Sequence, residues 1–317
     1  MREISNDKNL YIGFCENHEV PLFAEPWWLD IVTEGEWQVL LSLKGNNIEA
    51  SWVYFQRKKF GLSYIGMPKF SPYQGPFINY PDQQKKSRRI AFEKEVLTYL
   101  IDHMPNFAYF NQRFSPEFSN WLPLYWKGFE QTTRYTYVLP DISDPSHLWD
   151  SLQSRLRRAI RKAKNRYNLS VEESTKPEEF HRLHEMTYER QNKEVPCSLQ
   201  FFSKLYHTAK DLGRGEILLA YDQDGDIHAG VFIVWDKRTA YYLMGGADPS
   251  LRNSGASSLL LWEAINRQSG KREAFDFEGS MIESIEKIFR SFGAEQTPYY
   301  RIRKTLGVLS PLKLFIN

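Results

Sequence analysis

The stretch that decides the fold is Thr239–Ser280, which reads TAYYLMGGADPSLRNSGASSLLLWEAINRQSGKREAFDFEGS. It begins with an apolar strand pattern over 240–244, turns through Gly-Gly and Asp-Pro, and reaches RNSGAS at 252–257 just before a helical pattern. A second strand pattern over 274–278 follows, in which Phe275 and Phe277 alternate with two acids. We therefore expect a strand, a short arm, a helix and a second strand, with acidic side chains near the arm.

The arm between the first strand and the helix has the composition of an anion site. A glycine lets the backbone come close to a ligand, and the first N–H groups of a helix carry a partial positive charge. A helix that starts near Ser257 would therefore offer a place for a phosphate or pyrophosphate. The alternative is that Gly255 is only a turn glycine before a helix. The candidate donor-binding residues are Arg252, Asn253, Ser254, Gly255, Ala256 and Ser257.

This stretch resembles motif A of the GNAT acyltransferases, in which an Arg/Gln-x-x-Gly-x-Gly/Ala arm binds the pyrophosphate of an acyl-coenzyme A. Arg252, Gly255 and Ser257 take those places here, and the serine departs from the last one. The wider context, FDFEGS followed by IEKIFRSFGAEQTPYYRIRK, looks like the FemAB-like and BioF2-like branch, whose members carry two GNAT folds in tandem. The resemblance implies acyl-CoA as a co-substrate, with no tightly bound cofactor.

Length and composition are typical of a two-domain protein without a disulfide framework. The chain has 317 residues, a net charge of +2 and two cysteines, Cys15 and Cys197. The first residues form no long apolar run, and no segment reaches the length of a membrane span. We expect a soluble, cytoplasmic protein with no membrane span, no metal and no DNA partner.

The second half of the sequence repeats the plan of the first half. Three strand patterns over 37–66 precede a proline-rich loop, a helix and a strand, and three more over 216–244 precede the arm, a helix and a strand. Because each set of strands meanders before a crossover helix, we expect α/β architecture with mixed sheets. The predicted fold is two tandem GNAT-like domains: 1–139 on the acceptor side and 140–317 binding the donor.

A basic helix is expected between the two copies. Asp144 before Pro145 is a helix-start pattern, and residues 154–166 read SRLRRAIRKAKNR. Solvated charged flanks are one interpretation. By resemblance, the other is a cleft for an anionic partner, such as a nucleotide-diphosphate sugar precursor or an aminoacyl-tRNA. Arg158 and Arg161 are the candidate contacts.

Two acids after the helix are candidates for the general base, Asp276 and Glu278. Acyl transfer to an amine requires that the ammonium lose a proton, and burial between phenylalanines would raise a carboxyl pKa toward neutrality. The alternative is a half-solvated strand. By resemblance, Tyr299 or Tyr300 would protonate the leaving thiolate, although adjacent strand tyrosines also pack without any catalytic role.

The first copy lacks the Arg-x-x-Gly arm and has a loop around Tyr73, Gln74 and Gly75 at the matching place. This difference favours a donor in the second domain and an acceptor site shaped by the first, with Tyr73 and Gln74 as candidate contacts. His181 and His184 fall three residues apart on an expected helix, where a solvated face is favoured over a metal site.

The function we expect is N-acyl transfer from acyl-CoA to an amine by direct attack, with a small-molecule or cell-envelope precursor as the acceptor. The first alternative is a FemAB-like aminoacyltransferase that uses aminoacyl-tRNA and a peptidoglycan precursor. The second is a noncatalytic module that binds an anionic ligand. No nucleophile motif or Walker arm is present, so covalent catalysis is not expected.

Overall fold

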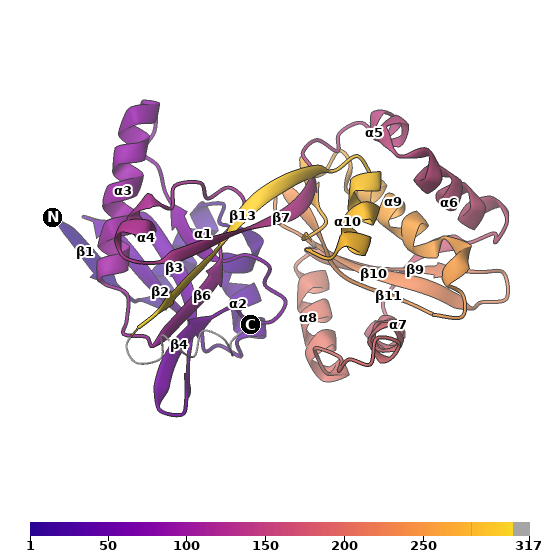
Figure 1. Cartoon of the computed structure of the whole chain (residues 1–317), viewed down its shortest axis with the longest axis horizontal. Coiled ribbons are helices and arrows are strands. Elements are labelled where there is room, and N and C mark those ends of the chain that lie inside the picture. Colours follow the sequence, from indigo (N-terminus) through magenta and orange to yellow (C-terminus); the bar gives the residue numbers. More distant parts are fainter. Residues whose placement is uncertain (280, 307–317) are drawn as a thin grey trace. The chain divides into compact units, whose positions relative to one another are not determined.

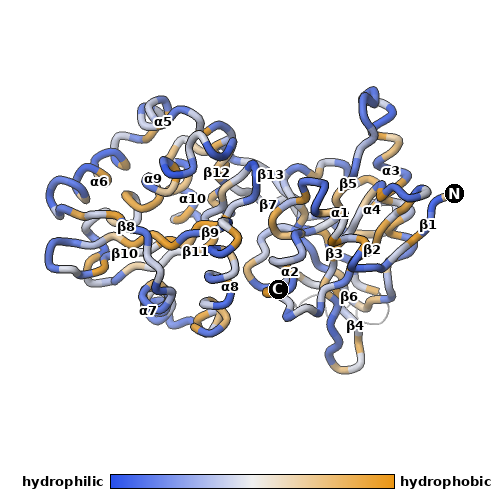
Figure 2. Tube along the Cα trace, turned by 180° about the vertical axis from the view of Figure 1, so that it is seen from behind, coloured by the Kyte–Doolittle hydropathy of each residue, from blue (hydrophilic) through white to orange (hydrophobic). Residues whose placement is uncertain are grey.

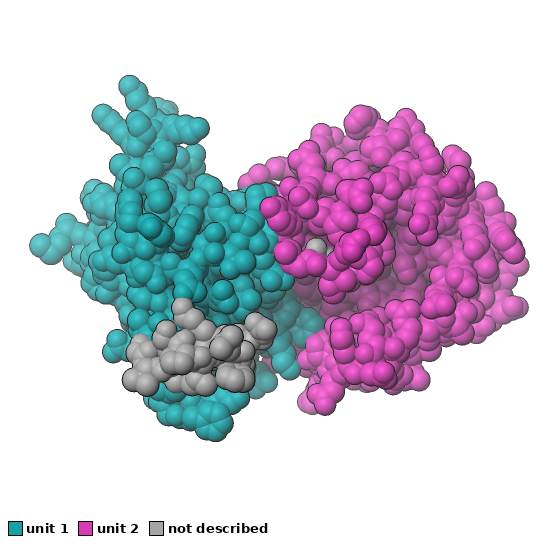
Figure 3. Space-filling model, in the orientation of Figure 1, with its two compact units in different colours: residues 1–134, 298–317 teal, residues 135–297 magenta. Residues whose placement is uncertain are grey.

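The computed structural model describes residues 1–279 and 281–306, and the chain divides into two compact units (Figure 3). Unit 1 contains Met1–Arg134 and the segment from Pro298 onward, and unit 2 contains Tyr135–Thr297. Strands β7 (Glu130–Leu139) and β13 (Glu295–Thr305) each have residues in both units. The boundary predicted from the sequence lies at 139, whereas the two units divide after Arg134 and again before Pro298.

Unit 1 is built on a mixed sheet in the order β1-β2-β3-β4-β6-β13, with β5 paired to β3. Strands β2 to β4 form the expected antiparallel meander, and β6 lies parallel to β4. Its elements are β1 (Arg2–Ser5), α1 (Lys8–Asn17), α2 (Pro26–Val32), β2 (Gln38–Lys44), β3 (Asn47–Lys59), β4 (Leu62–Gly66), β5 (Gly75–Ile78), α3 (Lys86–Asp102), β6 (Tyr109–Arg113) and α4 (Leu122–Trp126).

Both faces of the unit 1 sheet are covered by helices, which explains why its central strands are apolar throughout. Val39 and Leu41 pack with α1 and α2 residues in one core cluster, while Leu40 and Trp52 pack with α3 residues in another. Alternate side chains of a strand point to opposite faces, so β2 and β3 contribute to both clusters.

Unit 2 has the strand order β7-β12-β11-β10-β9-β8, with α7 and α8 on one face and α6 and α9 on the other (Figure 1). Strands β9 to β11 form an antiparallel meander, and β12 lies parallel to β11. Its elements are α5 (Pro145–Ser151), α6 (Ser154–Asn165), β8 (Ser170–Ser174), α7 (Pro177–Glu189), α8 (Leu199–Asp211), β9 (Gly215–Tyr221), β10 (Ile227–Trp235), β11 (Thr239–Ala247), the 3-10 turn η2 (Arg252–Ser254), α9 (Ala256–Gln268), β12 (Ala274–Asp276) and α10 (Glu283–Ser291).

The two units follow the same plan, as the sequence predicted. In each, three antiparallel strands lead to a helix that crosses to a strand parallel with the third. The expected helix start at Asp144 is also present, since its side chain accepts hydrogen bonds from the N–H groups of Ser146 and His147. Among the described residues, no helix combines the length and apolarity that crossing a bilayer requires.

Candidate active site

The candidate active site lies where the parallel strands β11 and β12 of unit 2 separate. Their pairing ends at Tyr241 and Asp276. Beyond this point Phe277 donates its N–H to Tyr137 O on β7 at 3.0 Å, whereas β11 continues beside β10 to Ala247. A bulge at Leu243 accompanies the separation, because Phe232 and Ile233 of β10 face Met244 and Tyr242. The chain therefore opens its sheet beside a bulge, a feature that recurs next to active sites.

The two candidate acids have different surroundings in this region. Asp276 is buried, and its Oδ1 accepts hydrogen bonds from the hydroxyl of Thr136 at 2.5 Å and from the N–H of Glu278 at 2.8 Å. These bonds hold the strand end against β7. Glu278 is half-buried and has a φ of 58°, which is uncommon outside glycine. The carboxylate of Glu278, rather than that of Asp276, is thus the candidate for proton transfer.

Glycine at 279 is required by the same turn. Its φ is +65°, and a Cβ atom there would lie 2.4 Å from the carbonyl oxygen of Tyr135. The left-handed pair Glu278 and Gly279 therefore brings the chain directly onto β7. A non-glycine residue at positive φ, such as Glu278, is the kind of strained backbone position that clusters at active sites.

Tyr242 is a residue of this site that the sequence did not single out. A Cβ atom built on Gly245 would lie 2.0 Å from the Tyr242 hydroxyl, so the phenol lies directly over this glycine. Burial raises the pKa of Tyr242 to about 12, with a further contribution from the negative charge of Glu278. The phenol is therefore protonated at neutral pH, and it lies near the carboxylate of Glu278.

The arm before α9 is placed as predicted, but its glycine has a structural use. Gly255 has a φ of +87°, and a Cβ atom on it would lie 2.5 Å from Ala159 O on α6. The glycine thus allows α6 and the arm to approach closely, which gives weight to the turn-glycine alternative. Lys162 of α6 donates to the carbonyl oxygen of Asn253 at 2.6 Å and ties the two segments together.

The other side of the arm is open to solvent. Arg252, Asn253 and Ser257 are exposed, whereas Ser254 and Ala256 are buried. Within the part of the chain that the structure describes, the N–H groups of Gly255 and Ser257 form no hydrogen bond. The first turn of α9 therefore presents unused donors beside two basic side chains, those of Lys162 and Arg252.

Helix α6 carries the basic residues predicted to contact an anionic partner, and its tube is mostly blue in Figure 2. Leu156, Ile160 and Ala163 are buried, whereas Arg158 and Arg161 are exposed. Arg161 lies 5.6 Å from the Trp149 ring. Neither arginine forms an ion pair with a described residue, so their charges are available to a ligand.

Tyr299 lies in unit 1, and the two acids lie in unit 2. Its hydroxyl accepts a hydrogen bond from Arg134 Nε at 3.2 Å, and its ring is 5.1 Å from the ring of Tyr73 in an edge-on arrangement. The structure thus joins Tyr299 to a predicted acceptor contact within unit 1. Tyr300 packs nearby against the unit 1 core.

Gln74 is buried beside Tyr73 in a small polar network. Its Oε1 accepts from Gln112 Nε2 at 3.1 Å, and Gln112 Oε1 accepts from Trp52 Nε1 at 2.8 Å. The Gln74 Nε2 group has no hydrogen-bond partner among the described residues. A buried amide with unused donors fits a place where a polar ligand group binds.

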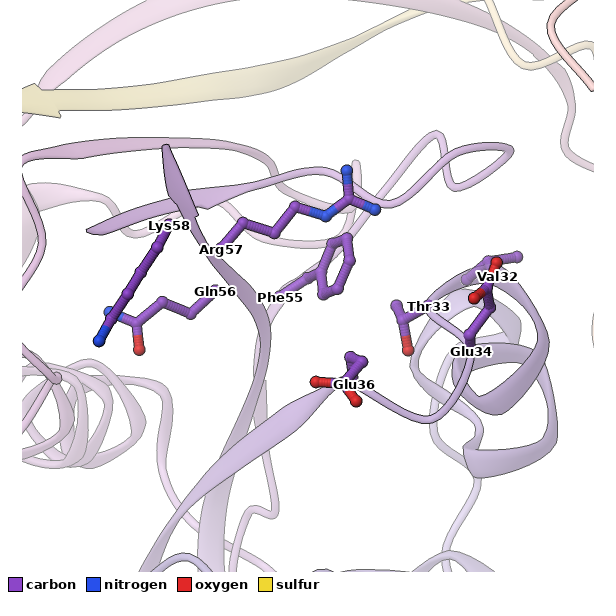
Figure 4. A pocket seen from close by; sticks show the side chains of 8 residues that line it. All are labelled: Val32, Thr33, Glu34, Glu36, Phe55, Gln56, Arg57 and Lys58. Atoms are coloured by element: carbon purple, nitrogen blue, oxygen red, sulfur yellow. The ribbon is translucent and has the colours of Figure 1, made fainter. Parts of the chain in front are cut away.

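A pocket of about 390 Å³ opens elsewhere in unit 1, between the end of α2 and β3 (Figure 4). It contains none of the predicted site residues. The pocket is lined by Val32, Thr33, Glu34, Glu36, Phe55, Gln56, Arg57 and Lys58.

The prediction that His181 and His184 lie on a solvated helix face is wrong. Their exposed fractions are 5% and 4%, because α7 turns this face toward β11 and the loop before α8. The missed indication was their position beside Phe180 and Leu183 on one helical stripe.

Comparison with known proteins agrees with this arrangement. Residues 150–280 match the family model described as an acetyltransferase (GNAT) domain. The chain is similar in structure to FemX, with 14% identity, a TM-score of 0.68 and 99% of each chain covered. It is also similar to a tandem GNAT protein from the clavulanic acid biosynthesis pathway, with 11% identity, a TM-score of 0.55 and coverage of 97% and 99%.

A third similar structure is L-PGS from Bacillus licheniformis, with 13% identity, a TM-score of 0.56 and coverage of 98% of this chain and 95% of that one. No curated protein matches the sequence significantly. The comparisons confirm the predicted fold class of tandem GNAT-like domains.

Proposed function

We propose, from the premise that unit 2 is an acyltransferase domain of the GNAT type, that the chain transfers an acyl group from acyl-CoA to an amine. The observation that carries the choice of donor is the open first turn of α9. The N–H groups of Gly255 and Ser257 form no hydrogen bond within the described residues, and Lys162 and Arg252 lie beside them. Such a combination favours a pyrophosphate.

The gap between β11 and β12 supplies groups for the chemical step. The acceptor amine attacks the thioester carbonyl carbon, a C–N bond forms, and the C–S bond breaks. Glu278 assists the loss of a proton from the ammonium. Tyr242, whose pKa of about 12 keeps it protonated, gives a proton to the leaving thiolate and regains one as the new amide nitrogen loses its second proton. Tyr299, which the resemblance implies for this step, remains the alternative proton donor.

Binding of acyl-CoA tests the proposed identity of the donor. Substitutions at exposed residues suit this test because they disturb the fold least. Gly255→Trp is unsuitable because the glycine lies against Ala159 and any side chain there disturbs the fold. Arg252→Glu and Ser257→Glu instead place negative charge on exposed residues of the arm. We expect acetyl-CoA to raise the melting temperature of the wild type and of Lys204→Glu, an exposed control on α8, but of neither arm variant.

Aminoacyl-tRNA is the second candidate donor, and the specific observation that favours it is α6. Its exposed arginines Arg158 and Arg161 form no ion pair with described residues, and α6 covers the glycine of the arm. A polyanion bound there would be released by salt. Weaker tRNA binding after Arg158→Glu and Arg161→Glu, together with no response to acetyl-CoA, would support this donor over the first.

A further inference from the structure

The buried side chain of His184 on α7 has one ring nitrogen that forms a hydrogen bond and one that has no partner among the described residues. Its Nδ1 lies 2.9 Å from the carbonyl oxygen of Gly245. A carbonyl oxygen only accepts, so Nδ1 carries the hydrogen and Nε2 of the neutral ring carries a lone pair. Nε2 is buried and has no hydrogen-bond partner among the described residues. A buried nitrogen without a donor is unusual in a folded protein.

The position of His184 connects it to the gap between β11 and β12. Gly245 belongs to the part of β11 that extends past the last pair with β12. At the next residue, a Cβ atom on Gly246 would lie 2.5 Å from the backbone nitrogen of His184, so α7 touches the strand directly. Thr187, one turn further along α7, accepts a hydrogen bond from Ala247 N at 3.1 Å. Helix α7 thus covers the stretch of β11 that β12 leaves.

Gly245 also links His184 to the proton donor proposed above. The hydroxyl of Tyr242 lies over this glycine, whose carbonyl oxygen accepts from His184. Gly245 thus leaves room for the protonated phenol, and its carbonyl oxygen accepts the hydrogen bond that leaves the other imidazole nitrogen unprotonated. General acid and base groups with pKa values on opposite sides of neutrality are a common arrangement for proton transfer.

The groups around His184 keep its ring neutral. Burial lowers its pKa below the ordinary value, and His181 on the same helix lowers it further. The bond to Gly245 and the charge of Glu185 act in the opposite direction. The aromatic rings of Phe180 and Tyr188 also lie beside the imidazole of His184. Their ring centroids are 6.0 and 4.8 Å from the centroid of the imidazole. A neutral imidazole is the form that can accept a proton at pH 7.

We propose that Nε2 of His184 is the proton acceptor for the acceptor amine, an assignment that rests on the proposed function. The ammonium gives its proton to Nε2, and the freed amine attacks the acyl carbonyl carbon. The C–N bond forms as the bond to the carrier breaks, and the leaving group takes the proton of Tyr242. The new amide nitrogen loses its second ammonium proton to the phenolate of Tyr242, and the imidazolium releases its proton to solvent. Glu278 assists the first proton loss by attracting the incoming ammonium to the site.

The tautomer of His184 can be measured without any substrate. Long-range 1H–15N correlation on protein labelled at histidine is expected to show Nδ1 protonated and Nε2 unprotonated at pH 7, with His184→Asn identifying the signals. A ring protonated on Nε2, or on both nitrogens at that pH, would overturn the proposal.

The catalytic part is tested by the pH profile of transfer. His184→Asn keeps an N–H donor near the place of Nδ1 and removes Nε2. We expect its kcat/KM to fall about 100-fold or more and the acidic limb of the profile to disappear, while the KM for the donor stays unchanged. His207→Asn, an exposed control on α8, should match the wild type.

The two proposals fail in different ways. A His184→Asn variant that keeps the wild-type profile overturns the role of His184 and leaves acyl transfer in place. A folded wild type that transfers no group from acyl-CoA or aminoacyl-tRNA overturns the proposed function and, with it, the catalytic role of His184.

Discussion

Gly255 packs so closely on the carbonyl oxygen of Ala159 that a Cβ atom built on the glycine would lie 2.5 Å from this oxygen. The same glycine is the N-cap of α9 and has a left-handed φ of +87°. The residue that resembles a phosphate-binding glycine thus also joins α6 to α9. Packing and the proposed ligand binding are separable, because the packing uses the side of the arm that faces α6 and the proposed site uses the exposed side.

Gly255→Ala should destabilise unit 2 whether or not a ligand is present. The added methyl group meets the backbone of α6 and the residue keeps a positive φ. Gly270→Ala is the control, since its φ is +72° but no atom lies within 4 Å of the added Cβ. We expect the Gly255 variant to lose about 1–3 kcal/mol more than the control, from the overpacking alone. Urea denaturation measures both, and equal losses would show that α6 does not confine the arm.

Thr136→Val tests whether Asp276 has a structural role, in contrast to the catalytic role proposed for Glu278. Valine keeps the shape of threonine but leaves the buried carboxylate of Asp276 without the hydroxyl donor that it has at 2.5 Å. We expect a loss of about 1–3 kcal/mol in the free energy of unfolding. Turnover by the folded fraction should stay close to that of the wild type and of Thr132→Val, an exposed control on β7. A large loss of turnover at unchanged stability would instead place Asp276 in the chemistry.

Tyr242→Phe should lower turnover without unfolding the chain. The hydroxyl that lies over Gly245 is lost, and with it the proton for the leaving group. We expect kcat to fall about 100-fold or more. The neighbouring Tyr241→Phe is the matched control, because its hydroxyl donates to Asp236 Oδ2 at 2.9 Å. Steady-state rates that fall equally in both variants would remove Tyr242 from the mechanism.

His184 should make stability depend on pH on the acidic side. Burial holds its pKa below the ordinary value, which is about 6.5. Below that pH the unfolded histidine binds a proton that the folded ring resists, so the free energy of unfolding falls as the pH falls. Above it the contribution is fully present. Chemical denaturation from pH 8 to 5 should therefore show a smaller decline for His184→Asn than for the wild type or His207→Asn. Parallel curves for all three would contradict a depressed pKa.

Local sequence patterns were sufficient to predict most of the helices and strands and the order of elements that the two units share. The cap at Asp144 and the arm before α9 depend on residues within a few positions of one another, and the structure has both, with α9 beginning at Ala256 rather than Ser257. Alternating apolar residues likewise predicted the two meanders.

The positions of several site residues depend on packing between segments far apart in the chain, and the sequence patterns did not predict them. Tyr299 belongs to unit 1 because β13 pairs with β6, where Arg301 faces Arg113, and no local pattern encodes that return. The contact of Gly255 with α6 joins residues far apart in the chain. The burial of His184 could have been expected from its helical stripe, whereas the place of Tyr242 depends on the bulge at Leu243.

The central claim is that unit 2 binds a phosphorylated acyl carrier at the first turn of α9, and calorimetric titration with acetyl-CoA tests it most directly. The account predicts saturable binding to the wild type and an affinity at least about tenfold lower for Ser257→Glu, since a negative charge then faces the N–H groups of the helix start. Equal affinities for the two proteins, or no binding of acetyl-CoA or aminoacyl-tRNA to the folded wild type, would contradict it.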